Sequence, residues 1–280
     1  MKTILISLYF FWFNLIGFGQ TSFMTFNIRY DSPTDGVDSW DNRKKEVCHL
    51  IDLYHPDFVG IQESMPNQVQ YINKHLKDYT FVGFGRDGEN TNSESVPIFY
   101  NSKKYQLLNS KVFWLSPTPN EITKGWDAAL NRITTYGAFI NKKTKDTISV
   151  FNTHFDHIGK IARTNSAKII LEKIIEYKLL KRQVIVMGDL NSLPEDEAIV
   201  ILKNKLKDAY KVSKKKPTGP EGTFNGFDYN MIPENRIDYI FTQNLKVLTY
   251  KVLNDKRNNQ RCISDHLPVL VEVSENIMMD

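Results

Sequence analysis

Residues 185–191, Ile-Val-Met-Gly-Asp-Leu-Asn, form an apolar run that ends in two polar residues beyond a glycine. Alternate residues of a β-strand point to the same face, so Asp189 and Asn191 can offer a carboxylate and an amide to one site. Such a pair supplies two oxygen ligands for a cation, or one base and one positioning group. A Gly-Asp-x-Asn sequence after a strand is also typical of an Asx turn, so this segment alone leaves both interpretations open.

Four other strand-like runs also end in polar residues that are capable of chemistry. These residues are Asn27, Glu63, His154, and the adjacent Asp265 and His266. Because open sheets place their functional groups at strand ends, we expect the side chains to converge on one site. Carboxylates and amides are the ligands that Mg²⁺ prefers, and a carboxylate or His can take a proton from an attacking water. The set therefore predicts metal-assisted hydrolysis of a phosphoester.

The order of these motifs is Asn, Gln-Glu, Asn-Thr-His, Gly-Asp-x-Asn, Ile-Asp-Tyr-Ile and Ser-Asp-His-x-Pro-Val. It resembles the endonuclease/exonuclease/phosphatase superfamily, and the resemblance runs from about residue 21 to residue 275. The resemblance implies an α/β fold, a four-layer α/β/β/α sandwich of two packed mixed sheets flanked by helices. It also implies a phosphoric ester hydrolase that depends on Mg²⁺ or Mn²⁺.

Carried over motif by motif, the resemblance implies that Glu63 is the principal metal ligand, helped by Asn27 and by Asp265. It implies five catalytic residues, which are His154, Asp189, Asn191, Asp238 and His266. Asp238 would pair with His266, because an Asp-His pair fixes the imidazole tautomer and stabilises its charged form. For Asp238 an ion pair with Arg236 is the competing interpretation. For either His alone, a hydrogen-bonded core position is the competing interpretation.

Three further basic residues are candidate contacts for the substrate phosphate. Arg132 opens a strand-like run, and a guanidinium there suits bidentate phosphate binding, although an exposed Arg at a strand start is often an ordinary solvated charge. His157 and Arg163 follow at a loop-to-helix entry, where helix N–H groups also favour anions. The sequence departs from some nuclease branches at Arg29, where they have a carboxylate two residues after the Asn. This difference weakens any second-metal role at that end.

The substrate stays open among nucleic acid, phospholipid head group and phosphorylated sugar, with a phosphodiester cleaved by in-line attack of water as the leading expectation. The alternatives are a lipid- or sugar-phosphate phosphatase on the same fold and a non-catalytic phosphate-binding module. The formal net charge of +4 is too small to indicate nucleic-acid binding by itself.

The motifs are spread over nearly the whole sequence, so a site that uses them all requires one domain, expected at residues 20–280. Helical patterns are expected at 43–55, 66–77, 160–180 and 195–206. Their alternation with strand-like runs favours an α/β layered structure. We expect a monomer.

Residues 1–19 have the pattern of a signal peptide, with Lys2 before the apolar run 3–18 and small residues near Gly19. A run of this length is short for a membrane span, although a membrane anchor stays open. We therefore expect export to the periplasm or the outside of the cell, with no stable membrane span after cleavage. Export would permit a disulfide between Cys48 and Cys262, but the sequence does not decide whether they pair.

Overall fold

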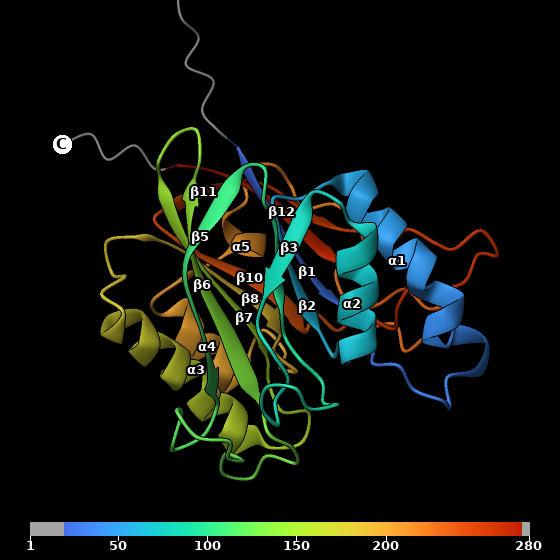
Figure 1. The fold of residues 1–280 in the computed structure, drawn as a ribbon, viewed down its shortest axis with the longest axis horizontal. Helices are drawn as coiled ribbons and strands as arrows, with labels where there is room; N and C mark the ends of the chain where they lie inside the picture. Colours follow the sequence, from blue (N-terminus) through green and yellow to red (C-terminus); the bar gives the residue numbers. More distant parts are fainter. Residues whose placement is uncertain (1–19, 276–280) are drawn as a thin grey trace, which may run out of the picture.

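The computed structural model describes residues 20–275, so the expected signal peptide at 1–19 lies outside the described residues. Two six-stranded sheets pack against each other, and helices cover both outer faces (Figure 1). Helices α1 and α2 lie on the outer face of one sheet, and α3 and α4 lie on that of the other. The four-layer α/β/β/α sandwich expected from the sequence is confirmed.

The first sheet has the strand order β11-β12-β1-β2-β4-β3. Its strands are β1 (Thr21–Asn27), β2 (Phe58–Gln62), β3 (Tyr79–Val82), β4 (Ile98–Asn101), β11 (Leu245–Val252) and β12 (Val269–Glu275). The parallel pairing of β1 with β2 sets Asn27 opposite Gln62, so Glu63 emerges beside Asn27. Ser264 Oγ donates a hydrogen bond to the Asn27 carbonyl (2.8 Å), which brings the segment before β12 to the same edge.

The second sheet has the strand order β5-β6-β7-β8-β10-β9. Its strands are β5 (Tyr105–Trp114), β6 (Ile133–Asn141), β7 (Thr147–His154), β8 (Gln183–Asp189), β9 (Lys207–Asp208) and β10 (Asp238–Gln243). The parallel pairing of β7 with β8 sets His154 opposite Asp189. The antiparallel pairing of β8 with β10 sets Asp189 opposite Asp238. Three predicted site residues therefore lie side by side through strand register alone.

The four expected helices are all present, with shifted ends. They are α1 (Trp40–Tyr54), α2 (Pro66–His75), α3 (Lys160–Glu176) and α4 (Glu197–Lys203), with the short helices η1 (Gly36–Asp38) and α5 (Ala209–Val212) besides. The largest shift is at the end of α3, which stops before the expected residue 180. Lys178 there has a left-handed backbone (φ 59°), which is incompatible with continuing the helix.

Alternate residues of the central strands enter different cores. In β8, Ile185 and Met187 face the other sheet, while Val184 and Val186 face the helices of the second outer layer. This period of two is the strand geometry that the sequence pattern indicates. Both faces of the strand are buried, which explains why the run is continuously apolar.

A polar bridge also joins the two sheets. Asn152 of β7 donates from Nδ2 to the Ile61 and Pro97 carbonyls (both 2.8 Å) and accepts at Oδ1 from Gln62 Nε2 (2.6 Å). The sheets approach so closely here that a Cβ added at Gly60 would lie 2.6 Å from Asn152 Oδ1. Because buried hydrogen bonds require a defined geometry, the bridge fixes β2 against β7 just below the strand ends that carry Glu63 and His154.

Both cysteines, Cys48 and Cys262, are buried and free. Within residues 20–275, no helix combines the length and the apolar character needed to cross a bilayer.

Candidate active site

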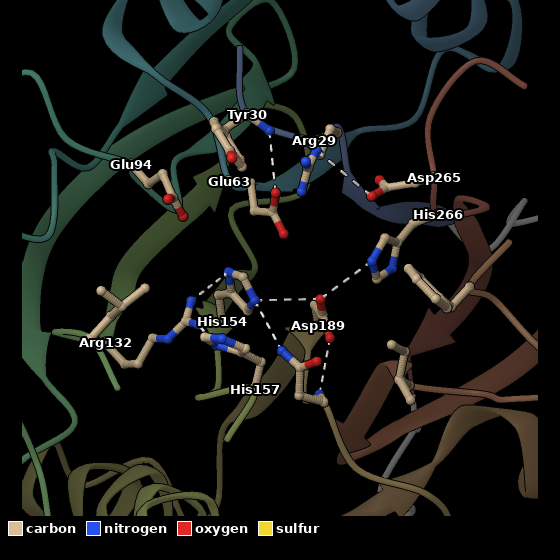
Figure 2. Close-up of a pocket in the computed structure, with 14 residues that line it drawn as sticks. Arg29, Tyr30, Glu63, Glu94, Arg132, His154, His157, Asp189, Asp265 and His266 are labelled. Carbon is tan, nitrogen blue, oxygen red and sulfur yellow. Dashed lines mark hydrogen bonds and ion pairs between the residues drawn. The ribbon is translucent and has the colours of Figure 1, made fainter. Parts of the chain in front are cut away.

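The predicted residues meet at a cavity of about 530 Å³ at the strand ends, with walls from both sheets. Figure 2 shows Asp265 and His266 on one side, His154, His157 and Arg132 on the other, and Asp189 between them. Among the predicted residues, those that line the cavity are Glu63, Arg132, His154, His157, Asp189, Asn191, Asp265 and His266. Asn27 and Asp238 lie behind this lining and hydrogen-bond to it.

Asn27 links two of the carboxylates. Its Nδ2 donates to Glu63 Oε1 (2.9 Å) and to Asp189 Oδ2 (3.0 Å), and its Oδ1 accepts from the backbone N–H of Arg29 (3.0 Å). Asn27 is fully buried, whereas Glu63 is half-buried and exposes part of its carboxylate to the cavity. In this arrangement the amide oxygen of Asn27 faces the backbone, so the residue positions carboxylates with its nitrogen.

Asp189 lies at the centre of the site and is almost fully buried. Gly188 precedes it with φ 150°, and a Cβ there would lie 2.0 Å from the Thr153 carbonyl, so only glycine lets β8 approach β7 this closely. Oδ1 of Asp189 accepts from the backbone N–H of Asn191 (2.9 Å). Burial raises the pKa of the Asp189 carboxyl to about 7, against the opposing effect of His266.

His266 and Asp238 form a buried pair. His266 Nδ1 lies 2.9 Å from Asp238 Oδ2, and Nε2 lies 3.7 Å from Asp189 Oδ2. Burial alone would lower the pKa of His266, but the charges of Asp238 and Asp189 outweigh it and hold the pKa well above its ordinary value. Arg236, the competing partner for Asp238, instead forms a bidentate ion pair with Asp208 (3.1 and 2.8 Å). Asp238 is thus paired with the histidine.

The electrostatic surroundings of His154 are opposite to those of His266. Its Nδ1 accepts from Arg132 Nη1 (3.0 Å), since a guanidinium can only donate. Its Nε2 lies 3.5 Å from Asp189 Oδ2 and 3.1 Å from Nδ2 of Asn191. Burial and the charge of Arg132 lower the pKa of His154 well below its ordinary value. His154 is therefore a neutral imidazole at neutral pH.

Arg132 is a buried positioning group and not the solvated charge that was one sequence interpretation. Its three donor nitrogens are each engaged, with Asp156 Oδ2 (3.3 Å), His154 Nδ1 (3.0 Å) and His157 Nδ1 (2.9 Å). The structure does not bring Arg163 to the cavity lining. Its side chain is buried and donates to the Asp156 carbonyl (2.9 Å), so it supports the loop that holds these groups.

Asp265 lies across the cavity and is largely buried. Its carboxylate is 4.0 Å from Nε of Arg29, which also forms two hydrogen bonds with Asp35 (both 3.1 Å). Burial raises the pKa of Asp265, against the opposing effect of His266. Arg29, which stands where some nuclease branches have a carboxylate, thus lies beside the Asp265 carboxylate.

The residues present fit a hard divalent cation. Carboxylate oxygens of Glu63 and Asp189 lie within 4.8 Å of each other and of a ring nitrogen of His266. The two carboxylates are the candidate ligands, because a charged imidazole has no lone pair to offer a cation. Carboxylate oxygens are the preferred ligands of Mg²⁺ and Mn²⁺. The raised pKa values of Asp189 and Asp265 reflect negative charge that burial makes unfavourable, and a cation beside them would relieve that cost.

Several residues of the site could not be singled out from the sequence. The main examples are Tyr30, Glu94 and Phe224, which line the cavity, and Asp156, which lies behind it and pairs with Arg132. Phe224 packs edge-on against the His266 ring with centroids 5.0 Å apart. Glu94 lies in the loop between β3 and β4, far from any strand-end motif. Asp156 follows His154 by two residues, and this closeness was the one available signal for its role.

Two packed mixed sheets, a cavity at the strand ends, a buried Asp-His pair and a cluster of carboxylates together supply the groups that hydrolysis of a phosphoester requires. The sequence matches the model of the Endonuclease/Exonuclease/phosphatase family over residues 24–266, and the chain belongs to this family.

Solved structures of similar chains have the same fold. An endonuclease/exonuclease/phosphatase family protein from Bacteroides thetaiotaomicron is 33% identical with a TM-score of 0.88, covering 93% of this chain and 99% of that one. A mannosyl-6-phosphatase from the same organism is 34% identical with a TM-score of 0.86, covering 90% of this chain and 99% of that one.

Among curated relatives, a probable RNA exonuclease from Saccharomyces cerevisiae is 29% identical over 171 residues, which are 56% of this chain and 33% of that protein. The tyrosyl-DNA phosphodiesterase 2 of Danio rerio is 26% identical over 144 residues, which are 51% of this chain and 35% of that protein. The chain therefore spans about a third of the length of the curated relatives that it matches first.

Proposed function

We propose that this chain is a hydrolase of phosphoesters that requires Mg²⁺ or Mn²⁺ and cleaves its substrate by in-line attack of water. The observation that carries the proposal is the cluster of Glu63, Asp189 and His266, in which two carboxylates and an imidazole have polar atoms within 4.8 Å of one another in a cavity of about 530 Å³. A site of this kind binds a phosphate group together with a cation.

Glu63 would hold the metal, and Asp265 would add negative charge from the other side. When bound, the metal would neutralise charge on the phosphate and favour ionisation of water. Asn27 keeps Glu63 and Asp189 at a fixed separation through its two hydrogen bonds (2.9 and 3.0 Å). An Asn27 side chain that acted as a ligand through Oδ1 would have to give up the hydrogen bond from Arg29 N–H (3.0 Å).

The chain's own residues would handle the proton. In the reaction, a bond forms between water oxygen and phosphorus, and the bond from phosphorus to the alcohol oxygen breaks. Asp189 and His266 are the groups that accept the proton of water and return a proton to the leaving oxygen. His154, whose Nδ1 accepts from Arg132 (3.0 Å), presents its other nitrogen to the phosphate, and Asn191 lies beside it (3.1 Å).

A phosphorylated sugar is the substrate class that we rank first. The mannosyl-6-phosphatase is 34% identical to this chain and is covered over 99% of its length, whereas the probable RNA exonuclease is covered over only 33%. A nucleic-acid phosphodiester, one of the substrates that the sequence left open, is the second candidate because of that exonuclease and the tyrosyl-DNA phosphodiesterase.

Hydrolysis of a substrate panel by the purified protein tests the proposal. The panel holds hexose phosphates, sugar phosphodiesters, single-stranded DNA, RNA, sphingomyelin and phosphoinositides, each with Mg²⁺, with Mn²⁺ and with chelator. We expect cleavage of the sugar phosphates that depends on the metal. Binding of hexose phosphates without cleavage of any panel member would identify a phosphate-binding module instead.

We also propose that the protein is exported as a monomer after removal of residues 1–19. The support is the apolar run 3–18 after Lys2, together with small residues near Gly19. N-terminal sequencing of protein recovered from the periplasm or medium would give Gln20 as the first residue, and an intact Met1 in a membrane fraction would indicate an anchor. Light scattering gives the oligomeric state.

A further inference from the structure

Glu94 lines the cavity, but the proposed hydrolysis does not use it. Figure 2 shows its carboxylate directed into the cavity on the side of Arg132, away from His266. The residue is half-buried and lies in the loop that connects β3 to β4. A carboxylate facing a phosphate pocket is unfavourable for phosphate binding, so another role has to account for its position.

The loop holds Glu94 in a defined place. Arg86 Nη1 donates to Glu94 Oε2 (2.9 Å), and the backbone N–H of Arg86 donates to the Glu94 carbonyl (2.9 Å). The Arg86 carbonyl in turn accepts from Trp114 Nε1 (2.7 Å). Because Trp114 belongs to β5, the Glu94 side chain is braced against the second sheet.

A second anchor fixes Glu94 relative to the metal-binding end. The backbone N–H of Ser95 donates to the Ser64 carbonyl (2.8 Å), and Ser95 Oγ donates to the same carbonyl (2.9 Å). Ser64 directly follows Glu63. The two glutamates are thus held at a fixed separation by their neighbours, which is how a site presents one group to the reacting atoms and another to the rest of the substrate.

The hydrogen-bonding state of Glu94 determines what it can bind. Arg86 occupies Oε2, and none of the described residues donates a hydrogen bond to Oε1. An ionised carboxylate only accepts hydrogen bonds, so its partner must bring an O–H or N–H group. Arg86 already offsets the negative charge, and this favours a neutral hydroxyl over an ammonium group.

The lining of the cavity offers little positive charge to a second anionic group. Among the described lining residues there is no lysine, and the two arginines are already paired, Arg29 with Asp35 and Arg132 with Asp156. A nucleic-acid chain would bring further phosphates that require basic partners. The cavity therefore suits an ester in which a single phosphate is joined to an uncharged, hydroxyl-bearing alcohol.

We propose that Glu94, held by Arg86, accepts a hydrogen bond from a hydroxyl group of the alcohol part of the substrate and thereby selects polyhydroxylated phosphoesters. The inference rests on the proposed function and extends it from the class of reaction to a specificity-determining residue.

The test compares Glu94→Gln with the wild-type protein and with Glu89→Gln, a matched control that removes a charge from an exposed position in the same loop. In Glu94→Gln the amide oxygen remains the acceptor for Arg86, so the amide nitrogen turns a donor toward the cavity. Each protein is assayed with Mg²⁺ on a hexose 6-phosphate, its monodeoxy analogues, phosphoethanolamine and phenyl phosphate, and thermal unfolding checks that each variant folds.

We expect Glu94→Gln to raise KM for the hexose phosphate so that selectivity over phenyl phosphate falls about tenfold to a hundredfold, the effect of losing a hydrogen bond to a charged group. One monodeoxy analogue should be a poor substrate for the wild-type protein and no worse than the parent sugar for the variant. The control should keep the wild-type selectivity.

Equal losses on hexose phosphate and phenyl phosphate would overturn the role of Glu94 while leaving the proposed hydrolysis intact. A loss of activity confined to phosphoethanolamine would show that Glu94 binds a cationic head group, and would overturn the proposal that it accepts a hydrogen bond from a hydroxyl group. Absence of hydrolysis of every ester by the wild-type protein would overturn the proposed function, and this inference with it.

Discussion

His266 and His154 lie on opposite sides of Asp189 and have opposite electrostatic surroundings. Both have Nε2 close to Asp189 Oδ2, at 3.7 Å and 3.5 Å. The Nδ1 of His266 meets the Asp238 carboxylate (2.9 Å), whereas the Nδ1 of His154 meets the Arg132 guanidinium (3.0 Å). The pKa of His266 is consequently raised well above its ordinary value, and that of His154 is lowered well below it.

The comparison shows that the partner on the far nitrogen decides what each imidazole can do. Burial acts on both rings in the same direction, because it always disfavours the charged form. The difference comes from one carboxylate and one guanidinium. One buried site thus holds a charged imidazole that can donate a proton and a neutral imidazole that can only hydrogen-bond, as is common where two titratable groups have different roles.

The strongest test removes the charged ring. We expect His266→Ala to lower kcat on a cleaved sugar phosphate by about 10²- to 10⁴-fold, the usual contribution of a general acid or base. Circular dichroism and thermal unfolding check the fold, and a turnover within a few-fold of the wild type would exclude His266 from catalysis. His154→Ala should have a smaller effect on kcat and a larger one on KM, if the neutral ring only binds phosphate.

The second test keeps the ring and removes its partner's charge. Asp238→Asn preserves the size of the side chain, but the pKa of His266 should fall because the largest charge that raises it is lost. We expect kcat to fall about 10- to 100-fold, as for other groups that orient a functional side chain. Histidine ¹⁵N chemical shifts followed against pH in the metal-free protein measure the pKa. An unchanged His266 titration would show that Asp189 and Asp265 hold the charge without Asp238.

The third test removes the guanidinium that keeps His154 neutral. Arg132→Met leaves Asp156, which is 1% exposed, without its cation. Breaking a buried ion pair by removing one partner typically costs about 3–5 kcal/mol, so the free energy of unfolding in urea should fall by about that amount. The pKa of His154 should rise at the same time. A change in unfolding free energy below about 0.5 kcal/mol would mean that water already solvates the pair.

The sequence could predict those residues of the site whose positions follow from strand register. Asp189, His154 and Asp238 are strand-end residues, and register alone sets them opposite one another in β7, β8 and β10. Apolar alternation and motif order therefore suffice for them. The four layers follow for the same reason, since buried strands and amphipathic helices have distinct periods.

The side-chain directions that loop backbone sets could not be predicted, even where the order of motifs placed the residue in the site, as for Glu63 and Asn191. Arg29, Glu63 and Asn191 all have positive φ, at 59°, 60° and 45°. These left-handed conformations direct the side chains in ways that a strand pattern does not encode. Arg132 was expected to contact phosphate, yet its donors face Asp156, His154 and His157, and such a choice of partners depends on the three-dimensional arrangement. Glu94 has no motif at all, because a loop brings it to the cavity.

The fourth test measures how Asp156 supports Arg132, whose guanidinium helps to keep the His154 imidazole neutral. Burial would raise the pKa of Asp156, but hydrogen bonds from the Gly159 and Ile158 N–H groups (2.8 and 3.0 Å) and the charge of Arg132 lower it to about 2 from an ordinary 3.8. A carboxyl whose pKa is depressed by folding stabilises the native state above its unfolded pKa, and that contribution disappears as the pH falls through the folded pKa.

Asp156→Asn is a permanent neutral analogue of the protonated side chain. We expect the variant to be less stable than the wild type at pH 6, with a difference in unfolding free energy that shrinks between about pH 4 and pH 2. Urea unfolding of both proteins over this range measures the difference, and other carboxyls cancel because both proteins share them. A difference that stays constant down to pH 2 would show that Asp156 acts through packing. In that case Arg132 would not owe its position to the Asp156 charge, and its hydrogen bonds with His154 and His157 would be what holds it in place.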